Sequence, residues 1–306
     1  MPKKFIPYDV IENYVIQAKN DPKFDKNIVL TGGEITSAYM HHSPDYVPKL
    51  LNMALDNKCM VDIKTNAGWA IAKNNLRNQI FNDLVGVLSA HSVSSFRITP
   101  LQISLSLDRF HPHALKKNTE FITELSRRQK NSACFVHVSS FPQDADLFQQ
   151  LLDSLRAKKC KLDQLMAFGS NPANASNTIW SVNGKIFLKF SVGTLFDGGR
   201  ARNIAGAYHT PAPQFTFITD EQNPTVLMAF DSFGNVTLGE NSGRKITTQW
   251  QDKNGNARPL ADIRRDIVRQ TRIEEIRYTC ETIALTNKAI KEKIKNVFSG
   301  LAIKKR

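Results

Sequence analysis

Small and polar side chains stand directly after several short apolar stretches of the sequence, where they could bind a ligand. The candidate binding residues are Gly32, Gly33, Glu34, Asn66, Ser106 and Asp108. Adjacent glycines let backbone approach a ligand closely, and a carboxylate such as Glu34 can accept a charge-assisted hydrogen bond from an ammonium group. The polar groups of Ser106 and Asp108 could hold a ribose. Each motif is also typical of an ordinary turn or strand end, and no catalytic residue can be assigned.

The elements that must position these residues alternate between strand and helix. Helices are expected between the strands, including one over 69–88, and the strands are expected over 27–31, 60–65, 101–107 and 134–139. This alternation predicts parallel βαβ units, and the apolar strands are typical of strands buried on both faces. Because ligands bind at the carboxyl ends of parallel strands, the candidate residues should share one rim. We also expect Ser104, Ser106 and Asp108 to lie on one face of their strand.

The alternation of strands and helices ends after residue 170. A hairpin turn is predicted at Asn183-Gly184 and a second one around Gly234. A charged helical segment is then expected over 260–297. We therefore expect a barrel-like α/β domain over 1–210 and a C-terminal extension over 211–306, made of a β-hairpin and charged helices.

The order of these pieces resembles the radical S-adenosylmethionine superfamily over residues 5–210. The shared pieces are a strand ending in TGGE, a strand ending in TN and a strand ending in SLD that is followed by FHPH. The resemblance implies a partial (β/α)6 TIM-like barrel. It implies that the segment 32–34 binds the amino group of S-adenosylmethionine and that Ser106 and Asp108 lie near its ribose. It also places Arg200 or Arg202 near a carboxylate.

The sequence departs from this family at the iron–sulfur cluster. The family holds a 4Fe–4S cluster with three cysteines spaced CxxxCxxC after the first barrel strand. The four cysteines here are far apart, at Cys59, Cys134, Cys160 and Cys280. The cluster ligands and the first strand are missing from the pattern, so we expect either a truncated fragment or an inactive relative that still binds S-adenosylmethionine. A barrel without its first strand would expose an apolar edge, which favours the fragment.

Two other function classes fit parts of the sequence. A metal-dependent barrel hydrolase could use histidine and aspartate ligands on one rim, namely His41, His42, Asp108, His111 and His113. A non-catalytic barrel could instead bind S-adenosylmethionine, a peptide or a nucleic acid. The substrate, a small molecule or a peptide, is not identified by any motif.

The charge and composition of the chain indicate which classes of partner it could bind. The net charge is +13, which allows a nucleic-acid surface. The basic C-terminal segment lacks the interleaved aromatic residues that stack on bases, so we interpret it as a solvated helix face. We expect no membrane contact, because no apolar run is long enough to cross a bilayer. Separate free cysteines and the lack of a secretory signal predict a cytoplasmic protein.

Overall fold

The computed structural model describes residues 5–24, 26–30, 35–92, 98–130, 132–167, 178–192, 195–196, 209–210, 228–230, 235–238 and 247–303. The chain divides into two compact units, Met1–Thr210 and Pro211–Arg306. Within the ranges given, no helix is both long and apolar enough to cross a membrane.

The first unit is built on a seven-stranded sheet with the order β1-β2-β3-β4-β7-β6-β5. Its parallel strands are β1 (Asn27–Leu30), β2 (Met60–Thr65), β3 (Ile98–Ser106), β4 (Ala133–Ser140) and β7 (Ile186–Val192). Strands β6 (Thr178–Val182) and β5 (Leu162–Ala167) continue the sheet in antiparallel fashion. The fold class is therefore α/β with a mostly parallel sheet, and the four parallel strands predicted from the sequence are confirmed.

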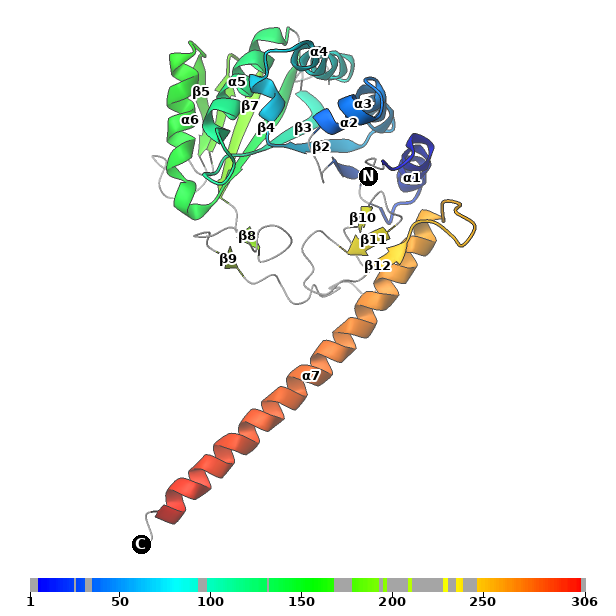
Figure 1. The fold of residues 1–306 in the computed structure, drawn as a ribbon, viewed down its shortest axis with the longest axis vertical. Coiled ribbons are helices and arrows are strands. Elements are labelled where there is room, and N and C mark those ends of the chain that lie inside the picture. Colours follow the sequence, from blue (N-terminus) through cyan, green and yellow to red (C-terminus); the bar gives the residue numbers. More distant parts are fainter. Residues whose placement is uncertain are drawn as a thin grey trace. The chain divides into compact units, whose positions relative to one another are not determined.

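Helices cover one side of this sheet, and α3 to α6 lie outside the strands (Figure 1). The helices are α1 (Tyr8–Asn20), α2 (Thr36–His41), α3 (Tyr46–Asp56), α4 (Asn75–Ala90), α5 (Ala114–Arg128) and α6 (Asp146–Ala157), with short 3-10 helices η1 (Gly68–Ile71) and η2 (Pro142–Asp144). Consecutive strands that lie side by side place their connecting helices on the same face when every crossover has the usual hand. The core between the two layers contains Phe81 and Phe121, which stack with ring centroids 5.8 Å apart.

The prediction that the strands are buried on both faces is wrong. Along β4, Cys134, Val136 and Val138 are fully buried, whereas the alternate residues Phe135 and His137 are only half-buried. Side chains alternate between the two faces of a strand, so only the face toward the helices belongs to the core. The apolar residues of the core face made each strand look continuously apolar. The residues between them line the other face, and most of these are polar, with Phe135 and Phe187 as exceptions.

The predicted hairpin between β6 and β7 is confirmed. Its turn residues Asn183 and Gly184 have φ angles of 54° and 67°. Two successive residues with positive φ form the turn type that matches strand twist in a two-residue hairpin. The Asn183 side chain also accepts a hydrogen bond from the Lys161 backbone N–H at 2.8 Å and donates one to Ser126 Oγ at 2.9 Å. The turn is therefore tied both to β5 and to α5.

Two short strands, β8 (Leu195–Phe196) and β9 (His209–Thr210), pair in the first unit. The second unit combines a small antiparallel sheet with one long helix. Its strands are β10 (Met228–Phe230), β11 (Asn235–Leu238) and β12 (Thr247–Gln249). Helix α7 (Leu260–Ile303) contacts β11 and β12, and it buries Leu260, Ile263 and Ile267 near its start.

Candidate ligand-binding face

The side of the large sheet that faces away from the helices carries polar side chains. We call this set the polar face, and its members are Asp62, Lys64, Gln102, Ser104, Ser106, His137, Ser139, Lys189 and Ser191. Each of them is half-buried or exposed, and each stands between two buried residues of its strand or beside one. Because alternate side chains of a strand point to the same face of the sheet, these residues from four strands lie on one surface.

One row of the polar face runs straight across β2, β3, β4 and β7. In register, Lys64 lies beside Ser104, Ser104 beside His137, and His137 beside Lys189. Neighbouring strands are about 4.8 Å apart, so the backbones of the two lysines are about 14 Å apart. The row therefore holds a positive charge at each end and two hydrogen-bonding side chains between them.

A carboxylate completes the charges of the polar face. Ser104 Oγ donates a hydrogen bond to Asp62 Oδ1 at 2.7 Å, and Gln102 Nε2 donates one to Ser104 Oγ at 3.3 Å. A carboxylate has about four acceptor positions, so Asp62 can take further donors. Asp62 lies two residues before Lys64 on β2, and the charges of Asp62, Lys64 and Lys189 all act on His137, so the polar face can complement a molecule that carries both charges.

His137 is held in its neutral form by its surroundings. Burial lowers the pKa of its imidazole, the charges of Lys189 and Lys64 lower it further, and Asp62 acts in the opposite direction. The Nε2 atom lies 2.6 Å from Ser191 Oγ, and the tautomer decides which of the two donates. A neutral imidazole presents one donor and one acceptor, so it can bind an uncharged polar group between the two lysines.

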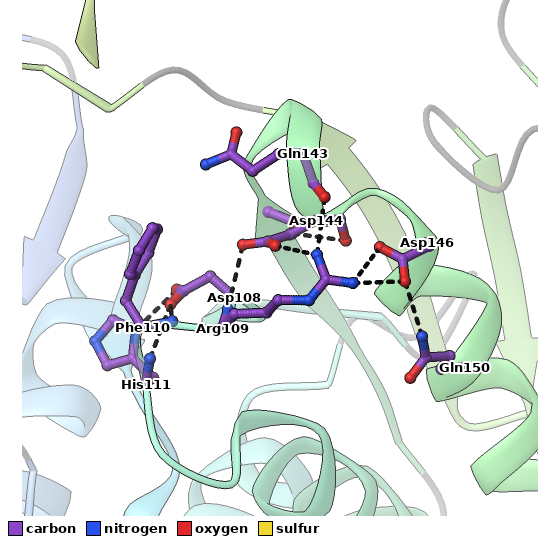
Figure 2. Close-up of polar contacts among 9 residues, drawn as sticks. Asp108, Arg109, Phe110, His111, Gln143, Asp144, Asp146 and Gln150 are labelled. Carbon is purple, nitrogen blue, oxygen red and sulfur yellow. Dashed lines mark hydrogen bonds and ion pairs between the residues drawn. The ribbon is translucent and has the colours of Figure 1, made fainter. Parts of the chain in front are cut away.

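Asp108 lies beyond the end of β3 and not on its face. Strand β3 ends at Ser106, Leu107 is buried, and the Asp108 side chain is only 4% exposed. Its Oδ1 accepts hydrogen bonds from the backbone N–H groups of Phe110 and His111, both at 2.9 Å, and its Oδ2 lies 2.7 Å from His111 Nδ1 (Figure 2). The chain turns at this point, which is why the expected alternation through Asp108 fails.

The electrostatics of Asp108 fit this structural role. Burial would raise the pKa of its carboxyl, but the hydrogen bonds and charge of His111 and the backbone N–H of Phe110 together outweigh burial and lower it. Three of its acceptor positions are occupied within its own turn. Asp108 therefore stabilises the loop after β3, which leaves little of the carboxylate for a ribose.

Arg109, which the sequence gave no reason to single out, joins the loops that follow β3 and β4. Its guanidinium bonds both oxygens of Asp146, at 2.9 and 2.7 Å, and it also pairs with the buried carboxylate of Asp144 (Figure 2). Its backbone N–H donates to Asp144 Oδ2 at 3.2 Å. These contacts fix the carboxyl-terminal edge of two neighbouring strands. Only a three-dimensional view reveals them, because the partners are far apart in sequence.

The other predicted binding residues fall in different places. Asn66 follows β2, and its Oδ1 accepts a hydrogen bond from the Gly68 backbone N–H at 2.8 Å, which shapes the turn into η1. Ser106 lies on the polar face at the end of β3. Gly32, Gly33 and Glu34, together with the arginine-containing segment 197–202, lie outside the residues that the structure describes. The structure thus places Ser106 on the polar face, and Asn66 and Asp108 in supporting turns.

Of the five proposed metal ligands, the structure brings Asp108 and His111 into contact but does not gather the others around them. His42 stacks on Tyr46 with ring centroids 4.3 Å apart, His111 binds Asp108, and His113 starts α5 with a φ of 61°. Over the described ranges there is no group of three histidine, cysteine, aspartate or glutamate residues placed to hold a metal ion.

The cysteines do not fit the thiolate set that an iron–sulfur cluster needs. Cys59, Cys134 and Cys160 are buried in the core, and Cys280 is exposed on α7. Burial raises the pKa of the Cys59 thiol and raises that of Cys134 to about 12. Burial thus favours the protonated thiol at both positions, and among the described residues the cysteines form no group placed to hold a metal ion.

No protein-family model matches the chain, and no curated protein is similar to it. The geometry of the polar face is therefore the main guide to function.

Proposed function

We propose that the first unit is an open partial barrel and that its polar face binds S-adenosylmethionine without cleaving it. The single observation that supports this proposal best is the one-sided sheet. A parallel sheet normally has helices on both faces. Here the second face carries Asp62, Lys64, His137 and Lys189, which are half-buried or exposed in the structure as described.

The charges of the polar face suit this ligand. S-adenosylmethionine carries an ammonium group, a sulfonium group and a carboxylate. Asp62 would attract the two cationic groups, and Lys64 or Lys189 would pair with the carboxylate. The neutral His137 and the Ser191 hydroxyl beside it would offer hydrogen bonds to the uncharged nucleoside.

In the radical enzymes of this superfamily, a cluster supplies the electron that cleaves the cofactor. Because the described cysteines do not fit such a cluster, the proposal is limited to binding. The affinity that the side chains alone provide is expected to be about millimolar, or roughly 4 kcal/mol.

The proposal is tested by titration calorimetry of the full chain with S-adenosylmethionine. Asp62→Asn and Lys189→Met should each weaken binding about tenfold or more, because each removes a charge-assisted hydrogen bond worth about 1.5–3 kcal/mol. Lys185→Met is the matched control, since Lys185 lies in the hairpin turn at the other end of β7.

S-adenosylhomocysteine, which lacks the sulfonium charge, should bind more weakly than S-adenosylmethionine. The proposal fails if the wild-type chain binds neither compound at about 10 mM. It also fails if Asp62→Asn and Lys189→Met bind as well as Lys185→Met does.

A further inference from the structure

The distal part of α7 carries a row of exposed isoleucines. Ile273, Ile276 and Ile283 are 53%, 67% and 56% exposed. Cys280 stands among them and is also exposed. From Arg272 to Lys288, every side chain whose burial is described is exposed except that of Glu274. An apolar row of this length in contact with water is unusual and marks an interaction surface.

The spacing of this row is that of a coiled coil. Steps of three and four residues alternate along it and continue through the sequence beyond Ile283. We call these eight positions the α7 stripe. It consists of the exposed residues Ile273, Ile276, Cys280, Ile283 and Asn287, and the sequence spacing alone continues it to Ile290, Ile294 and Val297. In heptad terms, Ile273, Cys280, Asn287 and Ile294 occupy position a, and the other four occupy position d.

The stripe is separate from the face that α7 buries in its own unit. The buried residues Leu260, Ile263, Ile267 and Thr271 follow their own helical spacing and end just before Ile273. The helix thus uses one row for its own sheet and begins a second row where the first ends. Most helical stability in proteins comes from packing an apolar face, so we expect the second row to pack against a partner of its own.

We propose that copies of this chain associate through the α7 stripe in a parallel, in-register coiled coil. Asn287 is the main reason to choose a second copy as the partner. A buried asparagine at an a position needs a hydrogen-bonding partner at the same level, and an identical helix supplies it. Cys280 of one copy would likewise face the partner's Cys280.

The size of the stripe is sufficient for a reversible association. Full burial of an aliphatic side chain removes about 60–120 Å² of apolar surface. With all eight positions packed, two copies of the stripe would therefore bury on the order of 1,000 Å², which is about the smallest area that a specific interface needs. We expect association at micromolar concentrations and not a permanent dimer.

The edges of the stripe predict an unusual dependence on salt. Arg272 and Arg277 occupy the flanking positions g and e, so an in-register parallel pair sets each against the other arginine of the second copy. Like charges repel, and salt screens them. Self-association should therefore not weaken as salt is added, whereas association with a partner helix that has acidic edges should weaken as salt is added.

The test uses the full chain in sedimentation equilibrium. At about 50 µM, the apparent mass of the wild-type protein should be a multiple of the 34.5 kDa mass of one chain. This apparent mass should stay the same or increase when the salt concentration is raised. Isoleucine at position d also suits three strands, so a dimer or a trimer supports the proposal. A monomer at every salt concentration overturns it.

Two sets of variants locate the interface. Ile283→Asp places a charge in the stripe and should give a monomer, whereas Leu285→Asp should not, since Leu285 is 69% exposed but lies at position f. Circular dichroism must show that both variants are folded. Equal association of the two variants overturns the proposal.

A short bismaleimide should join two wild-type chains through Cys280, and Cys280→Ser should abolish the product. Association without this product overturns the parallel, in-register arrangement.

Discussion

At the scale of single residues, His137 makes the stability of the first unit depend on pH. The folded state holds this imidazole neutral, chiefly through burial and then through two nearby lysines. The unfolded chain binds a proton near pH 6.5, before the folded chain does. The full stability is therefore present above about pH 6.5 and decreases as the pH falls toward the lower pKa of the folded state.

Replacing His137 with glutamine should remove this loss of stability. Urea denaturation between about pH 7.5 and pH 5 would measure it, as the pH-dependent part of the free energy of unfolding. His41→Gln is the control, because His41 is an exposed residue at the end of α2. If His137→Gln keeps the same slope as the control, the buried imidazole is not its source.

Asp108 leads to a second residue-scale prediction. Asp108→Asn should lower the free energy of unfolding by about 1.5–3 kcal/mol at pH 7, because it removes a charged acceptor from a buried turn. The lowered pKa means that this contribution is complete above about pH 3.8 and is lost as the pH falls through the pKa of the folded state.

Ser106→Ala should change stability far less than Asp108→Asn, since Ser106 is the half-buried last residue of β3. Equal effects of the two substitutions in chemical denaturation would contradict the assignment of Asp108 to the loop.

At the scale of elements, the sequence predicted most of the sheet. The four parallel strands and the β6–β7 hairpin were expected, because apolar runs and an Asn-Gly turn are strong local signals. Strand β5 was missed because it has no such run, and its apolar residues Leu165 and Met166 are half exposed. The helix expected over 69–88 is instead the short helix η1 followed by α4, which starts after Asn74 caps the Arg77 backbone N–H.

The candidate site was harder to predict than the fold. The sequence predicts ligand-binding residues after the strand ends, whereas Asp62, His137 and Lys189 lie within strands. Their signal was the polar residue at every second position, as in His137 and Ser139 of β4. That signal is hidden when a short strand is interpreted as uniformly apolar, and no local pattern shows which strands will be neighbours.

The hairpin turn allows the cost of its backbone conformation to be separated from the cost of its side-chain contacts. Asn183→Gly loses both hydrogen bonds of the side chain but tolerates the positive φ. Asn183→Ala loses the same bonds and must also adopt a left-handed conformation, which costs about 1 kcal/mol more. Thermal denaturation should therefore rank alanine below glycine at this position. The reverse order would mean that the turn relaxes to another type.

At the scale of the whole molecule, the net charge of +13 predicts a general affinity for polyanions. Nucleic acid should bind without sequence preference, and its affinity should fall steeply, by orders of magnitude, between about 50 and 200 mM salt. Fluorescence anisotropy with two unrelated oligonucleotides would measure this. A preference that persists at about 200 mM salt would instead indicate a sequence-specific surface.

The positions of the cysteines allow the opening of the first unit to be followed by chemical modification. Cys59, Cys134 and Cys160 are buried in the first unit, while Cys280 is exposed in the second. In dilute solution, where the chains are separate, a thiol reagent should therefore modify Cys280 at once and the other three only when the core opens. Mass spectrometry after timed exposure would then give the number of modified cysteines in each chain. The rapid modification of Cys280 would show that the reagent is active, and each later modification would report an opening of the first unit.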